Sequence, residues 1–302
     1  MDQAGLLELR VASPRVQRSG AGHLGLVVRT NPIGAIGAGG ILLLVLVSLL
    51  APVLAPFEPT AQIAKRFTEP SWTYIMGTDD VGRDVFSRLI YGARVSLWVG
   101  VVAVGISTLL GVTSGLIAGF FGGMIDNVLM RLVDILLAFP GLILAIIIAS
   151  YLGPSLTNTM ISIGIVGAPH KARIARAPVL SILTEDYILA ARVLGASNGR
   201  ILLRYVLPNT MAPLIVSTSL SLSGAILADA GLSFLGLGTQ PPDPSWGAML
   251  QEGRRYMEDA WWMALYPGLG IMLAVLSFNL LGDGLRDILD PRLRGSSAGP
   301  DK

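Results

Sequence analysis

The chain has 302 residues, of which 52% are hydrophobic and 14% are charged. Soluble domains carry about 25% charged residues, so this chain has too few charges to cover a globule and is expected to be an integral membrane protein. Its formal net charge is only +2 and its Lys and Arg are scattered, a pattern that excludes nucleic-acid binding. It has no Cys and two distant His, so we expect no disulfide, no thiol nucleophile, no metal and no other cofactor on this chain.

Five long stretches without charge mark the membrane-spanning part of the chain. A spanning helix needs roughly 20 apolar residues, so each stretch holds at least one. The third stretch is too long for a single helix, and the turn signal Gly153-Pro154-Ser155 divides it in two. The sequence therefore predicts an all-α polytopic protein with six transmembrane helices, near residues 33–55, 97–121, 131–152, 157–176, 205–229 and 261–282.

The distribution of Lys and Arg predicts the side of the membrane that each connecting segment occupies. With the N-terminus inside, the inner segments hold 15 of these residues and the outer segments hold 7, which is the bias of the positive-inside rule. The first hydrophobic segment is too long for a signal-peptide core, so we expect it to be retained. The predicted organisation is a cytoplasmic segment 1–30, a first transmembrane helix 31–56, an extracytoplasmic loop 57–94, a core 95–290 with five transmembrane helices and a cytoplasmic loop 177–204, and a cytoplasmic tail 291–302.

Two outer segments are long enough to have structure of their own. After Gly82, charged and apolar residues alternate at spacings near 3.6, which predicts an amphipathic helix on the membrane surface within 57–94. The segment 230–260 contains Gly and Pro at positions that forbid a long helix, so we expect a shaped loop. Trp261 and Trp262 follow it and are expected to anchor the sixth helix at the membrane interface.

The connector between the fourth and fifth predicted spans is the most informative segment. Residues 187–194 form a helix-forming run, Gly195 is a stop signal, and a second apolar run reaches the bilayer at Pro208. The spacing Ala190-Ala191-x3-Gly195, followed by Leu207-Pro208, resembles the EAA loop of permease subunits of bacterial ABC importers. Leu189 stands where that family has Glu, which leaves the role of the acidic residue open.

Three further runs resemble one branch of the same family. They are Gly77-Thr78-Asp79-x-x-Gly-Arg83-Asp84, Leu232-Ser-Phe-Leu-Gly-Leu-Gly-x-Gln240-Pro-Pro and Gly282-Asp-Gly-Leu-Arg-Asp287. Each is similar to the second permease subunit of peptide/nickel importers. The resemblance implies a type I ABC importer permease (MetI-like) fold in a bacterial inner membrane, with both termini cytoplasmic. It also implies a second permease subunit, two ABC ATPase subunits and an extracytoplasmic binding protein as partners.

The chain contains no phosphate-binding loop of the form Gly-x4-Gly-Lys-Ser/Thr, so we expect that it is not an enzyme and that ATP-Mg binds only to the partner ATPases. The connector would then transmit force from those ATPases. Leu189, Val193 and Leu194 would supply apolar contact, and small residues would permit close approach. The residues that the resemblance assigns to the ATPase-coupling loop are Leu189, Ala190, Ala191, Arg192, Gly195, Leu207 and Pro208.

Other residues are candidates for the path and for docking. Ser217 and Ser221 share a face of the fifth span and could line an uncharged path, although such hydroxyls usually bond their own backbone or a neighbouring helix. The resemblance implies that the outer segments dock the binding protein. The candidates there are Asp79, Arg83, Asp84, Gln240 and Trp246.

For some residues the sequence leaves open whether their role is structural or functional. Gly111, Gly115 and Gly119 share a helical face that packs either within this chain or against a second permease. Asp229 is expected to anchor the Gly-rich loop that follows it, rather than to act in transport. Pro140, inside the third span, is expected to bend its helix.

The cargo and the rival classes also stay open. Dipeptides, longer peptides, glutathione, opines and nickel chelates all fit the resemblance. An ATP-independent secondary transporter would need buried carboxylates in mid-span, and the charge-free stretches contain no Asp or Glu. An intramembrane enzyme would need a paired Asp-Asp, Ser-His or His-Glu-x2-His set within the membrane, which the sequence lacks.

Overall fold

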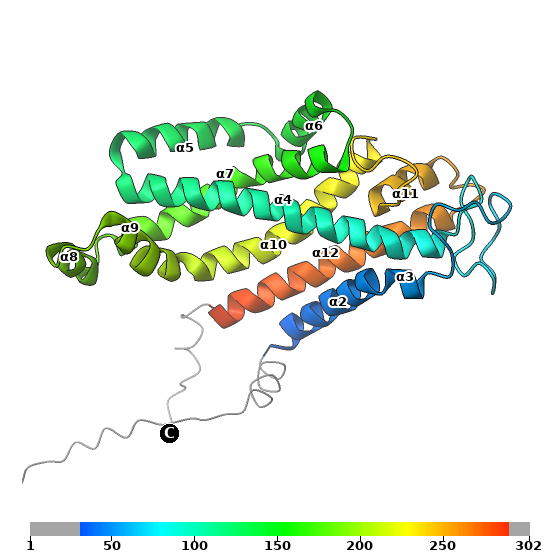
Figure 1. The fold of residues 1–302 in the computed structure, drawn as a ribbon, viewed down its shortest axis with the longest axis horizontal. Helices are drawn as coiled ribbons and strands as arrows, with labels where there is room; N and C mark the ends of the chain where they lie inside the picture. Colours follow the sequence, from blue (N-terminus) through cyan, green and yellow to red (C-terminus); the bar gives the residue numbers. More distant parts are fainter. Residues whose placement is uncertain (1–30, 290–302) are drawn as a thin grey trace, which may run out of the picture.

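A computed structural model describes residues 31–289, and within this range the fold is built from helices and loops (Figure 1). An isolated bridge between Thr78 and Asp84 is the one piece of β pairing there. The elements in chain order are α2 (Pro32–Leu49), α3 (Ala51–Leu54), α4 (Val85–Phe121), α5 (Gly123–Leu137), α6 (Gly141–Leu152), α7 (Leu156–Ile182), α8 (Asp186–Val193), α9 (Asn198–Ile201), the π-helix η1 (Leu202–Val206), α10 (Leu207–Phe234), α11 (Trp246–Arg254) and α12 (Trp262–Leu289).

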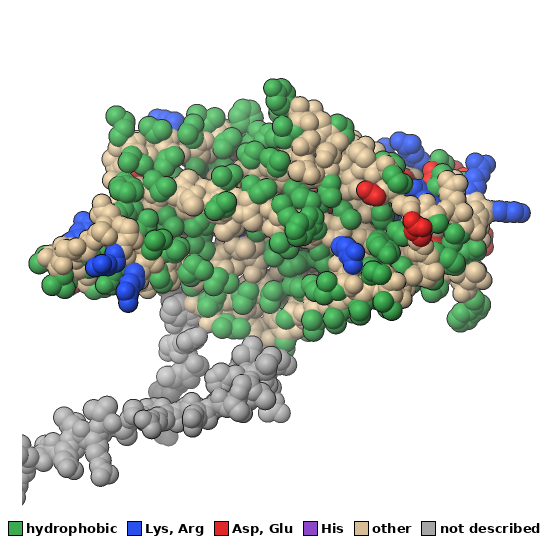
Figure 2. Space-filling view, viewed as in Figure 1, with side chains coloured by type: hydrophobic (Ala, Val, Ile, Leu, Met, Phe, Trp, Pro, Cys, Tyr) green, Lys and Arg blue, Asp and Glu red, His purple; other side chains and the backbone are tan. Residues whose placement is uncertain are grey.

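The long helices lie side by side in one elongated bundle (Figure 1). α4 packs along α7, α10 packs against α4, α7 and α12, and α2 packs against α12. Helices α8 and α9 lie at one end of the bundle, which we call the α8 end, and α11 with the segment 57–84 lies at the other, the α11 end. Charged side chains gather at these two ends, and the surface between them is largely hydrophobic (Figure 2).

Four helical segments of the described chain are long and apolar enough to cross a membrane, namely Pro32–Leu49, Val85–Phe121, Asn198–Phe234 and Trp262–Leu289. The pair α5 and α6, bent by 92° at their junction, makes a fifth candidate if the two helices form one broken span. Helix α7 has 27 residues, which is about 40 Å of helix at 1.5 Å per residue, but its charged C-terminal half lowers its hydropathy. The chain thus passes between the two ends in the alternating order that six predicted spans require.

Two predicted boundaries are wrong. The amphipathic helix expected on the membrane surface does not form a separate element, because α4 runs without a break from Val85 to Phe121 and its first turns are buried in the bundle. The third span is not one helix. Two consecutive glycines with positive φ, Gly122 (+63°) and Gly123 (+53°), separate α4 from α5, and the bend expected at Pro140 is a complete break between α5 and α6.

The glycine face of α4 packs within this chain. A Cβ at Gly111 or Gly115 would collide with the backbone of α7, and at Gly115 the atom met is the carbonyl oxygen of Ala172. A Cβ at Gly119 would lie 3.0 Å from the side chain of Val179. Small residues let two helix backbones approach closely, and here the partner is α7 rather than a second subunit.

Trp262 is not an interface anchor. Its side chain is buried at the α11 end, where its Nε1–H donates to the carbonyl oxygen of Thr78 at 3.1 Å. This bond fixes the first turn of α12 to the segment 57–84. Trp261, the neighbouring residue, is exposed.

Candidate coupling helix and translocation path

Helix α8 ends as the sequence predicts. Gly195 has φ +79°, the Gly195 N–H donates to the carbonyl of Arg192, and the Ala196 N–H donates to the carbonyl of Ala191, each at 3.0 Å. These two bonds form a Schellman cap, which requires a left-handed residue and therefore favours Gly. The Gly stop is confirmed, and it turns the chain sharply toward α9.

The two faces of α8 differ. Ile188 and Ala191 are buried against the bundle, whereas Leu189, Ala190 and Arg192 are exposed. Ala191 therefore packs on its own chain and does not belong to a surface that a partner could touch, in contrast to the expectation for it. The buried face joins a cluster formed by Leu116, Phe120, Val179, Ile201 and Val206.

The tip of α8 is apolar and exposed. Val193 is 88% exposed and Leu194 is 86% exposed, although both follow a helix that is fixed to the bundle by its other face. These large apolar side chains are not covered by any part of the chain between residues 31 and 289, and such exposure is typical of a contact surface for another protein.

A continuous helical segment joins this connector to the bundle. Leu207 and Pro208 lie inside it, at the start of α10. Pro208 has no N–H and cannot make the regular bond to the carbonyl of Arg204, and the turn before it is a π-helix in which the Leu207 N–H donates to Leu202. Because of this π-helical turn the helix continues through Pro208 without a break, so α9, η1 and α10 form one continuous helical segment, which we call the strut.

The hydroxyls of α10 make bonds inside the chain. Ser217 and Thr218 accept hydrogen bonds from Nζ of Lys171, at 3.0 and 3.1 Å, and Ser221 donates to the carbonyl of Ser217 at 2.7 Å. Lys171 itself is buried. Ser217 thus helps to solvate a buried ammonium group, which sequence reasoning did not foresee.

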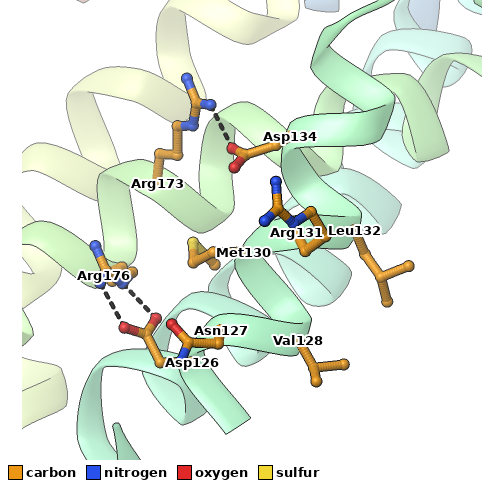
Figure 3. Close-up of a pocket in the computed structure, with 9 residues that line it drawn as sticks. All are labelled: Asp126, Asn127, Val128, Met130, Arg131, Leu132, Asp134, Arg173 and Arg176. Atoms are coloured by element: carbon orange, nitrogen blue, oxygen red, sulfur yellow. Dashed lines mark hydrogen bonds and ion pairs between the residues drawn. The ribbon is translucent and has the colours of Figure 1, made fainter. Parts of the chain in front are cut away.

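A polar cleft of about 1040 Å³ opens between α5 and α7 near the α8 end, and we call it the α5–α7 cleft. Two ion pairs cross it (Figure 3). Arg176 binds Asp126 through two bonds of 2.6 and 2.5 Å, and Arg173 binds Asp134 through one bond of 2.7 Å. The other lining residues are Asn127, Val128, Met130, Arg131 and Leu132.

A second cavity, which we call the central cavity, has a volume of about 560 Å³ and lies among α4, α6, α7 and α10. Its wall is mainly apolar, with polar groups from Ser107, His170, Arg173 and Ser221. Arg173 lines both the cleft and this cavity. Ser221 also lines a third, largely apolar groove of about 770 Å³ beside α12, to which Ser217 contributes. The two predicted path residues therefore lie at cavity walls.

The charged residues proposed for docking are buried at the α11 end. Asp79 and Arg83 form an ionic cluster with Arg88 and Glu252, and Asp84 is buried beside it. Arg83 binds Asp79 at 2.5 Å and Glu252 at 3.2 Å, and the Asp84 carboxylate caps α4 by accepting from the amide of Ser87. The burial of these three side chains does not favour direct contact with a binding protein, and their assignment to docking stays a prediction.

The same cluster contains three carboxylates close enough to hold a cation, from Asp79, Asp80 and Glu252. Arg83 and Arg88 form ion pairs with these carboxylates, so two of the three negative charges have a partner charge within the cluster. Burial raises the pKa of the Glu252 carboxyl above its ordinary value, although the two guanidinium groups act in the opposite direction. The arrangement is a structural ion-pair network.

Trp246 is also buried, so its assignment to a docking surface stays a prediction that its burial does not support. Its Nε1–H donates to the carbonyl of Leu89 at 3.0 Å, and its ring fills the space beside Gly92 and Gly270. Gln240, by contrast, is exposed and lines a cavity of about 780 Å³ at the rim of the α11 end. Asp229 is buried in α10 with Ser233 as its hydrogen-bond partner at 3.4 Å.

The charged residues of α5 and α7 were missed as a site. Arg173 and Arg176 were counted only as positive charges near the inner end of the fourth span, and Asp126 and Asp134 were not considered. Their position in or beside predicted spanning helices was a signal, because ionisable groups there tend to face the bundle interior or a water-filled cavity. What the sequence did not reveal is that α5 lies opposite α7.

Comparison with known proteins defines the family. Residues 111–295 match the binding-protein-dependent transport system inner membrane component, and residues 27–70 match the N-terminal transmembrane domain of oligopeptide transport permease C. The chain belongs to the family of binding-protein-dependent transport system inner membrane components, and it is a multi-pass membrane protein.

The curated relatives are more specific. The chain is 49% identical over 269 residues to the di/tripeptide transport system permease protein DppC of Pseudomonas aeruginosa, which covers 86% of this chain and 89% of that protein. It is 45% identical over 273 residues to the dipeptide transport system permease proteins DppC of Haemophilus influenzae and of Escherichia coli, which cover 88% of this chain and 92% and 91% of those proteins.

Among solved structures, the chain resembles a chain of the MetNI methionine ABC transporter in an inward-facing conformation. The TM-score is 0.55 at 20% identity, and the match covers 68% of this chain and 97% of that chain. A likeness at this identity concerns the fold, and it confirms the predicted MetI-like permease fold.

Proposed function

We propose that this chain is one of two permease subunits of an ATP-driven importer of short peptides. The observation that carries the proposal is its 45–49% identity, over most of its length, to permeases named for dipeptide or di/tripeptide transport. Glutathione, opines and nickel chelates fit the family but are not named among these relatives. A binding protein on the outer side delivers the peptide.

The α8 connector is the proposed contact for an ATPase subunit. Its exposed residues Leu189, Ala190 and Arg192 and the apolar tip Val193–Leu194 form the contact surface. The Schellman cap and the strut that passes through Pro208 give it a rigid connection to α10. Closure of two ATPases around ATP-Mg would move this surface and tilt the bundle as largely rigid bodies, from inward-facing to outward-facing.

The proposed path of the peptide follows the central cavity and the α5–α7 cleft. Both are wide enough for a short peptide and both carry polar groups. A second permease subunit would close the open side of this path. Docking of the binding protein is reassigned to the exposed rim at Gln240, because the other proposed residues are buried.

The orientation of the protein is part of the proposal. We place the α8 end, toward which the N-terminal end of α2 and the C-terminal end of α12 point (Figure 1), in the cytoplasm. The excess of Lys and Arg in the segments on this side supports the assignment.

The test is reconstitution of the full complex in liposomes with its two ATPases, its second permease and its binding protein. We expect peptide-loaded binding protein to stimulate ATP hydrolysis and labelled peptide to accumulate inside. Uptake by this chain alone, or a loaded binding protein that fails to stimulate hydrolysis by the complete assembly, would contradict the proposal.

A further inference from the structure

The cleft between α5 and α7 is crossed by two ion pairs that differ in strength. Arg176 and Asp126 share two hydrogen bonds and have side chains that are 31% and 15% exposed. Arg173 and Asp134 share one bond and are 56% and 52% exposed. Bidentate, partly buried pairs are strong, whereas single exposed pairs contribute little. The Arg173–Asp134 pair is therefore the one that opens readily.

Helix α5 is connected so that this pair has room to open. It begins at Gly123, directly after Gly122; both have positive φ, and a Cβ added at either would meet no atom of another part of the described chain within 4 Å. It ends at the break before Pro140, and Val133 is its one buried residue. The helix is thus held to α7 mainly at its polar face, where the ion pairs lie (Figure 3).

Arg173 occupies the boundary between two cavities. It lines the α5–α7 cleft of about 1040 Å³ and also the central cavity of about 560 Å³. His170 lies three residues earlier, on the same face of α7, and lines the central cavity as well. A molecule that moves from one cavity to the other passes the guanidinium of Arg173 and the carboxylate of Asp134.

We propose that Arg173 and Asp134 form a transient binding site for the charged ends of a zwitterionic peptide, an inference that rests on the proposed peptide-import function. The peptide carboxylate takes the place of Asp134 on Arg173, and the peptide ammonium takes the place of Arg173 on Asp134. Both side chains are more than half exposed, so the pair opens at little cost and each charge becomes available to a charged end of the peptide. A zwitterion supplies both opposite charges at once.

The chemistry selects a class of cargo. A free peptide at neutral pH carries a carboxylate with a pKa of about 3.5 and an ammonium group with a pKa of about 8. An N-acetylated peptide has no ammonium group, and a C-terminal amide has no carboxylate, so each leaves one member of the pair without its partner. The path therefore adds a preference for unblocked peptides to whatever selection the binding protein makes.

The experiment uses the complete reconstituted importer and three matched probes, namely trialanine, N-acetyl-trialanine and trialanine amide. Initial uptake rates are measured at saturating binding protein, and each variant is compared with the unaltered complex so that the preference of the binding protein cancels. We expect Asp134→Asn to abolish the preference for a free amino end and Arg173→Gln to abolish the preference for a free carboxylate. For each variant, the ratio of the uptake rate of trialanine to that of the matching blocked probe should fall by about two- to fivefold, the effect of losing one exposed ion pair.

Two controls separate binding from structure. Asp126→Asn removes the stronger pair of the same cleft and should slow all three probes by one common factor. Arg173→Lys keeps the positive charge and should keep the preference for a free carboxylate. If Asp134→Asn and Arg173→Gln change the three probes equally, or if Arg173→Lys assembles and loses the carboxylate preference, the inference is overturned. Failure of the unaltered complex to take up trialanine would instead refute the proposed peptide-import function.

Discussion

Nη2 of Arg88 lies 3.3 Å from Oε2 of Glu252, a contact that joins residues 164 positions apart. Arg88 is in the second turn of α4, and Glu252 is near the end of α11. The guanidinium also donates to the carbonyl of Pro242 at 3.2 Å, and it is 1% exposed. Since the same side chain contacts α11 and the loop before it, Arg88 holds α4, this loop and α11 together at the α11 end.

Replacement of Arg88 by Met should destabilise this end of the protein. It removes one member of a buried network and leaves Glu252 without its main partner from α4, which costs about 3–5 kcal/mol for a buried pair. The measurement is the thermal unfolding of the purified complex in detergent, together with proteolysis of the segment 57–84. Arg88→Lys keeps the charge, so its thermal stability should lie between that of the unaltered protein and that of Arg88→Met. Equal stability of all three proteins would contradict the structural role of the network.

The glycine face of α4 allows a matched pair of single-methyl substitutions. Gly115→Ala should destabilise the bundle by about 1–3 kcal/mol or more, because the new methyl group would collide with the backbone of α7 at Ala172. Gly105→Ala is on the same helix with no atom within 4 Å, and it should be neutral or stabilise by about 0.5–1 kcal/mol. Thermal denaturation in lipid nanodiscs measures both. If Gly105→Ala is the more harmful change, the packing of α4 on α7 is not as described.

How far the sequence predicts this structure depends on whether a feature is local. The end of α8 was predicted because the stop signal, Gly195, and the bonds that close the cap lie within five residues of one another. The membrane spans were predicted because hydrophobic length is also a local property. The break around Pro140 was underestimated, since a proline in a spanning helix is compatible with either a bend or a full stop.

The roles of the site residues are harder to predict from the sequence, because they depend on partners that are distant along the chain. The sequence indicates Asp79 and Arg83 as docking candidates, whereas in the structure both are buried in an ion-pair network with Glu252 and Arg88. The face of Gly111, Gly115 and Gly119 was recognised, yet nothing in the chain indicated that α7 covers it. A polar motif next to a membrane can serve contact or folding, and only the packing distinguishes them.

Single-cysteine labelling tests the proposed orientation. The chain has no Cys, so a single introduced thiol meets no competing thiol in this subunit. Val193→Cys at the tip of α8 should react with a membrane-impermeant maleimide only from the cytoplasmic side, and Gln240→Cys at the α11 end only from the outer side. Both positions are exposed, so neither substitution disturbs packing. Labelling of both from the same side would refute the arrangement of the two ends.

The cap of α8 can be altered without a steric clash. Gly195→Val places a β-branched residue at φ +79°, where an L side chain costs roughly 1–2 kcal/mol, although no atom lies within 4 Å of the new Cβ. We expect the bundle to remain folded while the direction of the tip changes and peptide-stimulated ATP hydrolysis falls. Gly195→Asn is the control, because Asn tolerates the left-handed region, and it should retain most of the stimulation. Equal stimulation in the Val and Asn variants would show that the cap does not matter for coupling.

The apolar tip of α8 gives the sharpest test of the contact with the ATPase. Leu194 is 86% exposed in this chain, so Leu194→Ser should not reduce the stability of the isolated subunit. If the leucine is buried by the ATPase, its loss removes about 1.5–3 kcal/mol of apolar contact and weakens association by at least roughly tenfold. Co-purification of the ATPase and its dissociation rate measure this effect. Asn198→Ser, on the exposed start of α9, is the matched control and should leave association unchanged. Full ATPase binding by Leu194→Ser would remove the tip from the interface and leave only the lateral residues Leu189, Ala190 and Arg192 to form it.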